Sequence, residues 1–105
     1  MAFEEEGARC AAMLSDPKKK VMVMGNHGIL VMGDTVAETF NRMYFFERAA
    51  QNYIKALQTG QPLRVIPHEI AEKTASEIEA YPEQDVRHLA ELKAILDAEG
   101  SDYAA

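Results

Sequence analysis

Residues 21–32 have the sequence VMVMGNHGILVM, in which two apolar runs flank a short turn. Neither run alternates apolar and polar residues, so the sequence predicts two strands covered on both faces rather than strands with one face in water. Gly25 and Gly28 allow the chain to reverse direction between the runs. We therefore expect a β-hairpin over about 21–32, although the sequence offers no further strands to cover it.

A long helix is predicted directly after the hairpin. Thr35 and Glu38 have the spacing of a capping box, and Thr59-Gly60 followed by Pro62 supplies a stop. The helix therefore covers about 36–58, and one broad face carries the apolar residues Val36, Phe40, Met43, Tyr44, Ile54 and Leu57.

Shorter helices are expected on both sides of this unit. Helical spacing of apolar residues predicts one over 3–15, a second over 67–80 and a third from Pro82 to about Ala98. The fold class is thus α/β, with one hairpin and three to four helices, and the C-terminal helices together span about 67–98.

Composition excludes several functions. The 105 residues suit one small domain or part of a larger one, and their net charge of −6 argues against a nucleic-acid partner. No apolar run approaches the roughly 20 residues that span a bilayer, which argues against a membrane partner. Cys10 is the single cysteine and cannot form an internal disulfide, so we expect a reducing, cytoplasmic location.

His27 is the strongest candidate for chemistry. An imidazole in a turn between two strands is well placed to bind a metal or a substrate. The alternative is an ordinary turn residue, because Asn26 and His27 both tolerate left-handed backbone. Metal sites usually need three protein ligands. The other two histidines, His68 and His88, are remote in sequence, and we expect both at the surface.

Glu47 is the second candidate, because it falls within the apolar face of the long helix, between Tyr44 and Ile54. A carboxylate in such a stripe must be paired, hydrogen-bonded or placed in a cleft. It is therefore either a group that positions a ligand or a buried structural acid. Tyr44 is either a donor to a substrate or part of the core.

The order of these features resembles the class II aldolase/adducin family. An apolar strand, Asn-His-Gly at 26–28, a second apolar strand, Gly-Asp-Thr at 33–35 and a helix containing Phe-Glu-Arg-Ala-Ala at 46–50 occur in succession. The resemblance covers residues 1–63 closely and the remaining helices loosely. The helix end, LQTGQPL at 57–63, is similar to the adducin-head-like bacterial branch.

The resemblance implies the C-terminal part of a three-layer αβα domain. In enzymes of this family, three histidines at a subunit interface hold a divalent metal, often zinc, and His27 matches the ligand from the Asn-His-Gly turn. Gly25, Asn26 and Gly28 would shape that turn, and Glu47 and Tyr44 could support the site. The metal polarises a carbonyl and stabilises an enediolate in retro-aldol, epimerase or dehydratase chemistry on small hydroxy-carbonyl or sugar-phosphate substrates.

The sequence also departs from the family. It lacks the His-x-His pair, the upstream catalytic glutamate and the glycine-rich phosphate-binding segment. We therefore expect a chain with no catalytic residue of its own, inactive alone, that needs the first part of the domain or further copies, as the family is often tetrameric. Two alternatives are a non-enzymatic adducin-head-like interaction module and an α-rich domain that oligomerises through its hairpin.

Overall fold

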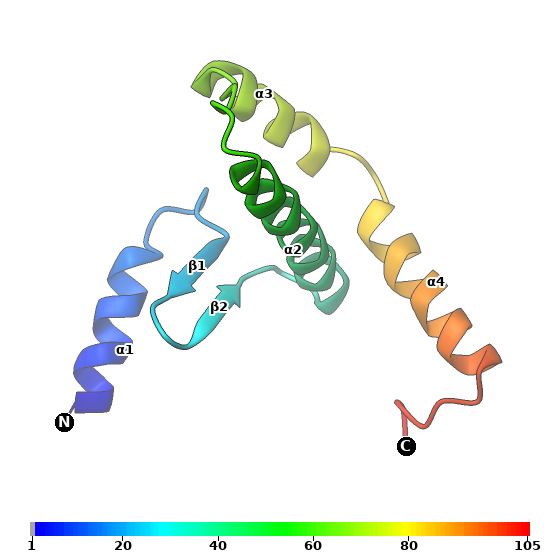
Figure 1. Cartoon of the computed structure of the whole chain (residues 1–105). Coiled ribbons are helices and arrows are strands. Elements are labelled where there is room, and N and C mark those ends of the chain that lie inside the picture. The colour runs from blue at the N-terminus through cyan, green and yellow to red at the C-terminus, as the bar shows by residue number, and fades with distance from the viewer. Residues whose placement is uncertain (1) are drawn as a thin grey trace.

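The computed structural model describes residues 2–105, which form one hairpin and four helices. In chain order these are α1 (Ala2–Met13), β1 (Val21–Met24), β2 (Gly28–Val31), α2 (Val36–Gln58), α3 (His68–Glu79) and α4 (Gln84–Ala98). Figure 1 shows α1 and α4 as two separate arms, with the hairpin and α2 between them and α3 across the top. The mixed α/β class with one hairpin is therefore confirmed.

The two strands pair antiparallel, in a register that places Val21 opposite Val31 and Met24 opposite Gly28. One further bond, from the Met32 amide to the Lys20 carbonyl at 2.8 Å, closes the base of the hairpin. Strand β2 begins at Gly28 and ends at Val31, so the predicted pair of strands is present and Met32 lies just beyond it.

The ends of α2 follow the local signals in the sequence. The Thr35 hydroxyl accepts a hydrogen bond from the Glu38 amide at 3.1 Å, which satisfies one of the free donors at the helix start. After Thr59, Gly60 adopts a φ of +71°, a left-handed conformation that ends helices readily. The predicted limits of this helix, 36 and 58, are those observed.

The main tertiary packing joins α2 to α4, and the start of α2 also contacts β2. The ring of His88 on α4 lies 4.5 Å from that of Tyr44 and 5.3 Å from that of Phe40, both on α2. By contrast, α1 packs against no other helix or strand of the part that the structure describes. Within residues 2–105, α3 likewise packs against no other helix or strand, although Glu79 at its end is bonded to Arg42 of α2, so α2 and α4 are the packed helix pair.

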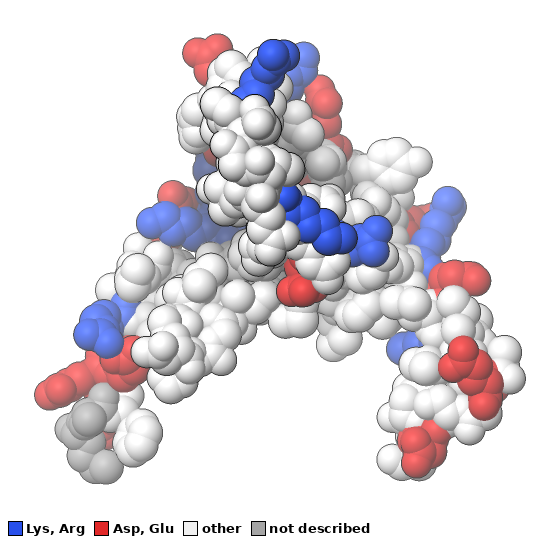
Figure 2. Space-filling model, viewed as in Figure 1, with Lys and Arg blue, Asp and Glu red and all other residues white. Residues whose placement is uncertain are grey.

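Most of the chain remains exposed. Its accessible surface is 8935 Å². A compact protein of 11.7 kDa exposes about 5,900 Å². Most of the face seen in Figure 2 consists of uncharged side chains, and acidic groups gather at the lower ends of the two arms. The difference of about 3,000 Å² is surface that this chain does not cover by itself.

The hairpin shows this exposure most clearly. Within residues 2–105, Met22 is the one buried hydrophobic residue, whereas Val23 is 70% and Leu30 is 39% exposed. The described chain therefore leaves the strands largely uncovered, as the lack of further strands in the sequence predicted. The physical reason is that covering both faces requires further layers, and the described chain holds only one two-stranded sheet.

None of the helices in residues 2–105 combines the length and the hydropathy that crossing a membrane requires.

Candidate functional site

The turn that carries His27 is a tight reversal between β1 and β2. The His27 amide donates to the Met24 carbonyl at 3.2 Å, so the turn closes across residues 24–27. Asn26 adopts a φ of +65°, as its predicted tolerance of left-handed backbone allows. The imidazole therefore sits at the tip of the hairpin, the point farthest from its base.

The two glycines of the turn have different roles. Gly28 adopts a φ of +134°, a conformation that residues with a Cβ rarely take, so the backbone requires glycine there. Gly25 has no positive φ, and a Cβ added to it would meet no described atom within 4 Å. Gly28 is thus fixed by the turn itself, whereas the turn alone gives no reason for Gly25.

His27 is exposed, and its ring makes no hydrogen bond, ion pair or ring contact with any described residue. Both ring nitrogens are therefore available to a ligand from outside the chain. A neutral imidazole is a common ligand of zinc and similar divalent ions, so this side chain fits the role of one ligand. A single imidazole is only part of the usual set of three or four protein ligands.

Glu47 and Tyr44 do not join His27. Glu47 is exposed and accepts a hydrogen bond from the Gln51 side chain at 3.2 Å, one turn further along α2. Tyr44 stacks edge-on against His88 and Phe45 instead. Neither side chain makes a hydrogen bond or ring contact with His27 among the described residues, so their predicted support of the site stays a prediction.

His88 lies in a different environment from the one predicted. It is half-buried between α2 and α4, and its Nδ1 lies 2.8 Å from the Asn41 side-chain oxygen. The expected surface position is therefore wrong for His88, whereas His68 is exposed as expected. The only local signal was the pair Phe40 and Tyr44, four residues apart on one face of α2, which indicates a ring-lined seam but not its partner.

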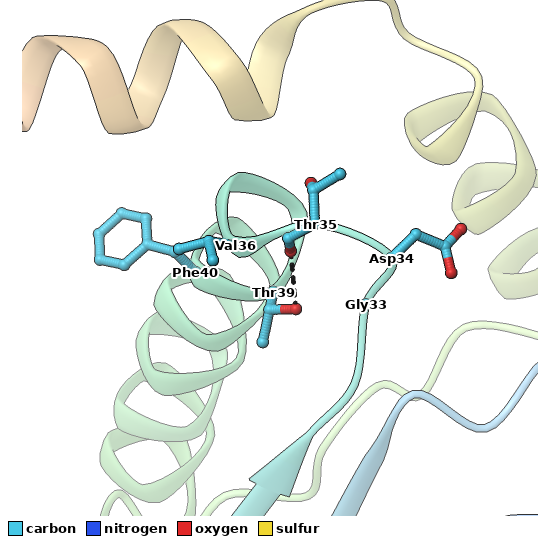
Figure 3. Close-up of a pocket in the computed structure, with 6 residues that line it drawn as sticks. All are labelled: Gly33, Asp34, Thr35, Val36, Thr39 and Phe40. Atoms are coloured by element: carbon cyan, nitrogen blue, oxygen red, sulfur yellow. Dashed lines mark hydrogen bonds between the residues drawn. The ribbon is translucent and has the colours of Figure 1, made fainter.

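A pocket of ≈480 Å³ lies at the start of α2, lined by Gly33, Asp34, Thr35, Val36, Thr39 and Phe40. Figure 3 shows that Thr39 bonds back to the preceding turn, where its hydroxyl donates to the Thr35 carbonyl at 2.9 Å. The Thr35 hydroxyl is used in capping. The polar groups here therefore serve the helix start, and Asp34 is the one charged side chain of the lining.

No group of three or more His, Cys, Asp or Glu side chains within residues 2–105 is arranged to hold a metal ion. His27 is thus one exposed ligand on a well-defined turn. The other ligands of any metal bound there would come from beyond the described part of this chain.

Part of the chain is similar to known proteins. The model of a family described as "Class II Aldolase and Adducin N-terminal domain" matches residues 1–54. A protein of Caulobacter vibrioides described as "Putative aldolase class 2 protein" is 37% identical over 68 residues. That match covers 65% of this chain and 26% of the relative, so the chain spans about a quarter of its length. No solved structure matches the chain.

Proposed function

Since residues 1–54 of 105 match its model, the chain belongs to the class II aldolase and adducin family, and we propose that it contributes a metal ligand to a divalent-metal-dependent lyase. In the complete protein, this ligand is His27 and the metal is zinc. The substrate class is a small hydroxy-carbonyl compound or a sugar phosphate, and the reaction is of the retro-aldol, epimerase or dehydratase type. The complete domain has three αβα layers and lies in the cytoplasm.

The observation that carries this proposal is the free imidazole at the hairpin tip. The turn backbone, fixed by Asn26 and Gly28, holds His27 away from the rest of the chain, and no described group competes for its ring nitrogens. A ligand that is already positioned loses less conformational freedom when it binds a metal. The turn backbone of His27 is positioned in this way, so binding a metal would cost mainly the freedom of its side chain.

The chemistry divides between this chain and the rest of the site. A bound divalent ion supplies Lewis-acid polarisation of a substrate carbonyl. The contribution of this chain is to present one neutral imidazole nitrogen and to hold the turn rigid through the ladder of β1 and β2. No side chain of the described residues is assigned to proton transfer, which falls to groups outside them.

The exposed surface supports the proposed partners. About 3,000 Å² more than a compact chain of this mass is exposed, and covering it from this side alone would bury as much as obligate interfaces bury on both partners together, about 2,000–5,000 Å². The apolar outer side of the hairpin, with Val23 70% exposed, is part of that surface. We propose that the remainder of the domain, or further copies of the chain, covers it and brings the other metal ligands to His27.

Metal analysis tests the proposal on the longest protein that the locus encodes. We expect His27→Ala to remove bound zinc, measured by elemental analysis, and to abolish turnover of hydroxy-carbonyl substrates. The matched control is His68→Ala, which removes an exposed histidine from α3 and should leave the zinc content unchanged. Full zinc occupancy in His27→Ala would contradict the proposal.

A second candidate is a non-enzymatic interaction module, and the uncovered surface favours it equally. In that case, the complete protein binds no metal and Val23→Glu, rather than His27→Ala, disrupts its assembly. Light scattering of the two variants, together with their zinc content, separates the two functions.

A further inference from the structure

Arg42 connects three separate parts of the chain. From the second turn of α2, its Nη1 donates to the Met32 carbonyl at 2.8 Å and lies 2.6 Å from a carboxylate oxygen of Glu38. Its Nε and Nη2 donate to the two carboxylate oxygens of Glu79, on α3, at 3.2 and 2.7 Å. The side chain is 13% exposed, whereas that of Arg87, in a simple surface pair with Glu83, is 78% exposed.

The electrostatics of this contact are favourable. The hydrogen bonds to Glu79 raise the pKa of Arg42, and Glu38 raises it further against the opposing effect of burial. The guanidinium therefore stays charged at neutral pH. A bidentate pair of hydrogen bonds from one guanidinium to one carboxylate also fixes the relative orientation of the two groups, which a single hydrogen bond does not.

The bond to Met32 holds the base of the hairpin. The Met32 amide donates to the Lys20 carbonyl and the Met32 carbonyl accepts from Arg42, so this residue links the base of the hairpin to α2. The next residue, Gly33, passes so close to α2 that a Cβ would lie 2.5 Å from the Thr39 hydroxyl and 3.2 Å from the Arg42 guanidinium. With Val23 and Leu30 exposed, these polar and close contacts are what the structure shows between the base of the hairpin and this part of α2.

A small tilt at the base has a large effect at the tip. Met32 and His27 are five residues apart, and at about 3.3 Å per residue the strand carries His27 roughly 16 Å from the anchor. A tilt of about 5° then moves the imidazole by roughly 1.4 Å, whereas metal–ligand distances are held to about 0.2 Å. Accuracy at His27 therefore depends on rigidity at Met32.

We propose that Arg42 is a positioning residue, which sets the orientation of the hairpin, and with it His27, relative to α2 and α3. The importance of that orientation for metal binding rests on the proposed function, whereas the restraint itself exists in the chain without metal. Lysine cannot replace arginine here, because a single ammonium group cannot reproduce the planar fork that reaches Met32 and both oxygens of Glu79.

Distances between spin labels test this role in the full chain. One pair joins the turn to α2 (His27→Cys with Gln51→Cys) and a second joins α2 to α4 (Gln51→Cys with Lys93→Cys), each in a Cys10→Ser background. With Arg42 present, we expect one narrow turn-to-helix distribution. In Arg42→Lys and Arg42→Met, this distribution shifts or broadens by about 1.4 Å or more, the displacement from a tilt of about 5°. The α2–α4 distance stays unchanged.

Arg87→Lys and Arg87→Met are the matched controls and leave both distributions as they are. The proposal is overturned by a broad turn-to-helix distribution in the presence of Arg42, by an unchanged one in Arg42→Lys, or by simultaneous loss of the α2–α4 distance, which would show a general effect on folding. The labels report where the turn lies and not what it binds. Retention of zinc by His27→Ala would therefore end the proposed function without changing this result.

Discussion

The α2–α4 pair and the hairpin are held by different forces. The helices share a seam in which Phe40, Tyr44 and His88 place their rings together, with Asn41 bonded to the histidine. The hairpin depends on its ladder, a glycine-dependent turn and the polar anchor at Met32, while much of its apolar surface faces solvent. The comparison shows that an element can be well defined in shape without a partner that covers it.

The largest expected effect comes from removing a ring from the helix seam. Phe40→Ala should lower the free energy of unfolding by about 2 kcal/mol, below the value for a fully buried ring because Phe40 is half-buried. Denaturant titration followed by circular dichroism measures it. A loss below about 0.5 kcal/mol, the usual range for surface positions, would show that this seam does not hold the helices together.

Next in size is the effect of changing the turn. Gly28→Ala places a Cβ on backbone with a φ of +134°, and we expect it to destabilise the hairpin by about 1–2 kcal/mol. Hydrogen exchange of the β1 and β2 amides reports this local loss. Gly25→Ala is the matched control, with open space around its Cβ, and equal exchange rates in the two variants would contradict the special role of Gly28.

Shortening an exposed hairpin side chain should matter less. Val23→Ala is expected to change the stability of the hairpin by less than about 0.5 kcal/mol, because that side chain is 70% exposed. The neighbouring Met22→Ala should cost at least about 1 kcal/mol, since Met22 is buried. The same exchange measurement compares them, and similar losses would mean that the chain covers both faces of the hairpin in solution.

The smallest effect concerns the hydrogen bond between Tyr103, just beyond the end of α4, and Asp97. The Tyr103 hydroxyl donates to Asp97 at 3.0 Å, and this bond, with smaller effects of burial and of the Asp97 charge, raises the pKa of Tyr103 above 10.0. A raised pKa favours the neutral phenol, so the bond is fully present below pH 10.0 and is lost as the pH rises through the higher value. Subtracting the absorbance titration of Tyr103→Phe from that of the unchanged chain isolates the ionisation of Tyr103. The midpoint of this difference should lie above pH 10.0, and a lower midpoint would exclude the bond.

Local patterns made much of the fold predictable. The hairpin follows from two apolar runs around Gly28, and the limits of α2 follow from Thr35 and Thr59-Gly60, because each signal acts within a few residues. The contacts that join these elements depend on residues far apart in sequence. Arg42 and Glu79 are one example, and Asn41 and His88 are another. No periodic pattern specifies such partners.

The candidate site was likewise predictable only in its local part. The turn around His27 was predictable from its own residues, while the ligands that would complete a metal site belong to no pattern in this chain. Glu47 shows that the apolar face of a helix does not by itself predict which residues are buried. Its place in the apolar face of α2 predicted a paired, hydrogen-bonded or enclosed carboxylate. Glu47 is hydrogen-bonded to Gln51, but it is exposed and not a buried structural acid. A stripe becomes buried only where another element lies against it.

The uncovered surface also has a calorimetric consequence. The heat capacity of unfolding grows with the apolar area that unfolding exposes, and compact domains show about 12–15 cal/mol/K per residue. With Met22 its one buried hydrophobic residue among those described, this chain should fall well below that range and show a broad thermal transition. When a partner binds and covers the hairpin, the binding reaction should show a negative heat-capacity change, because it buries the apolar surface that folding left exposed.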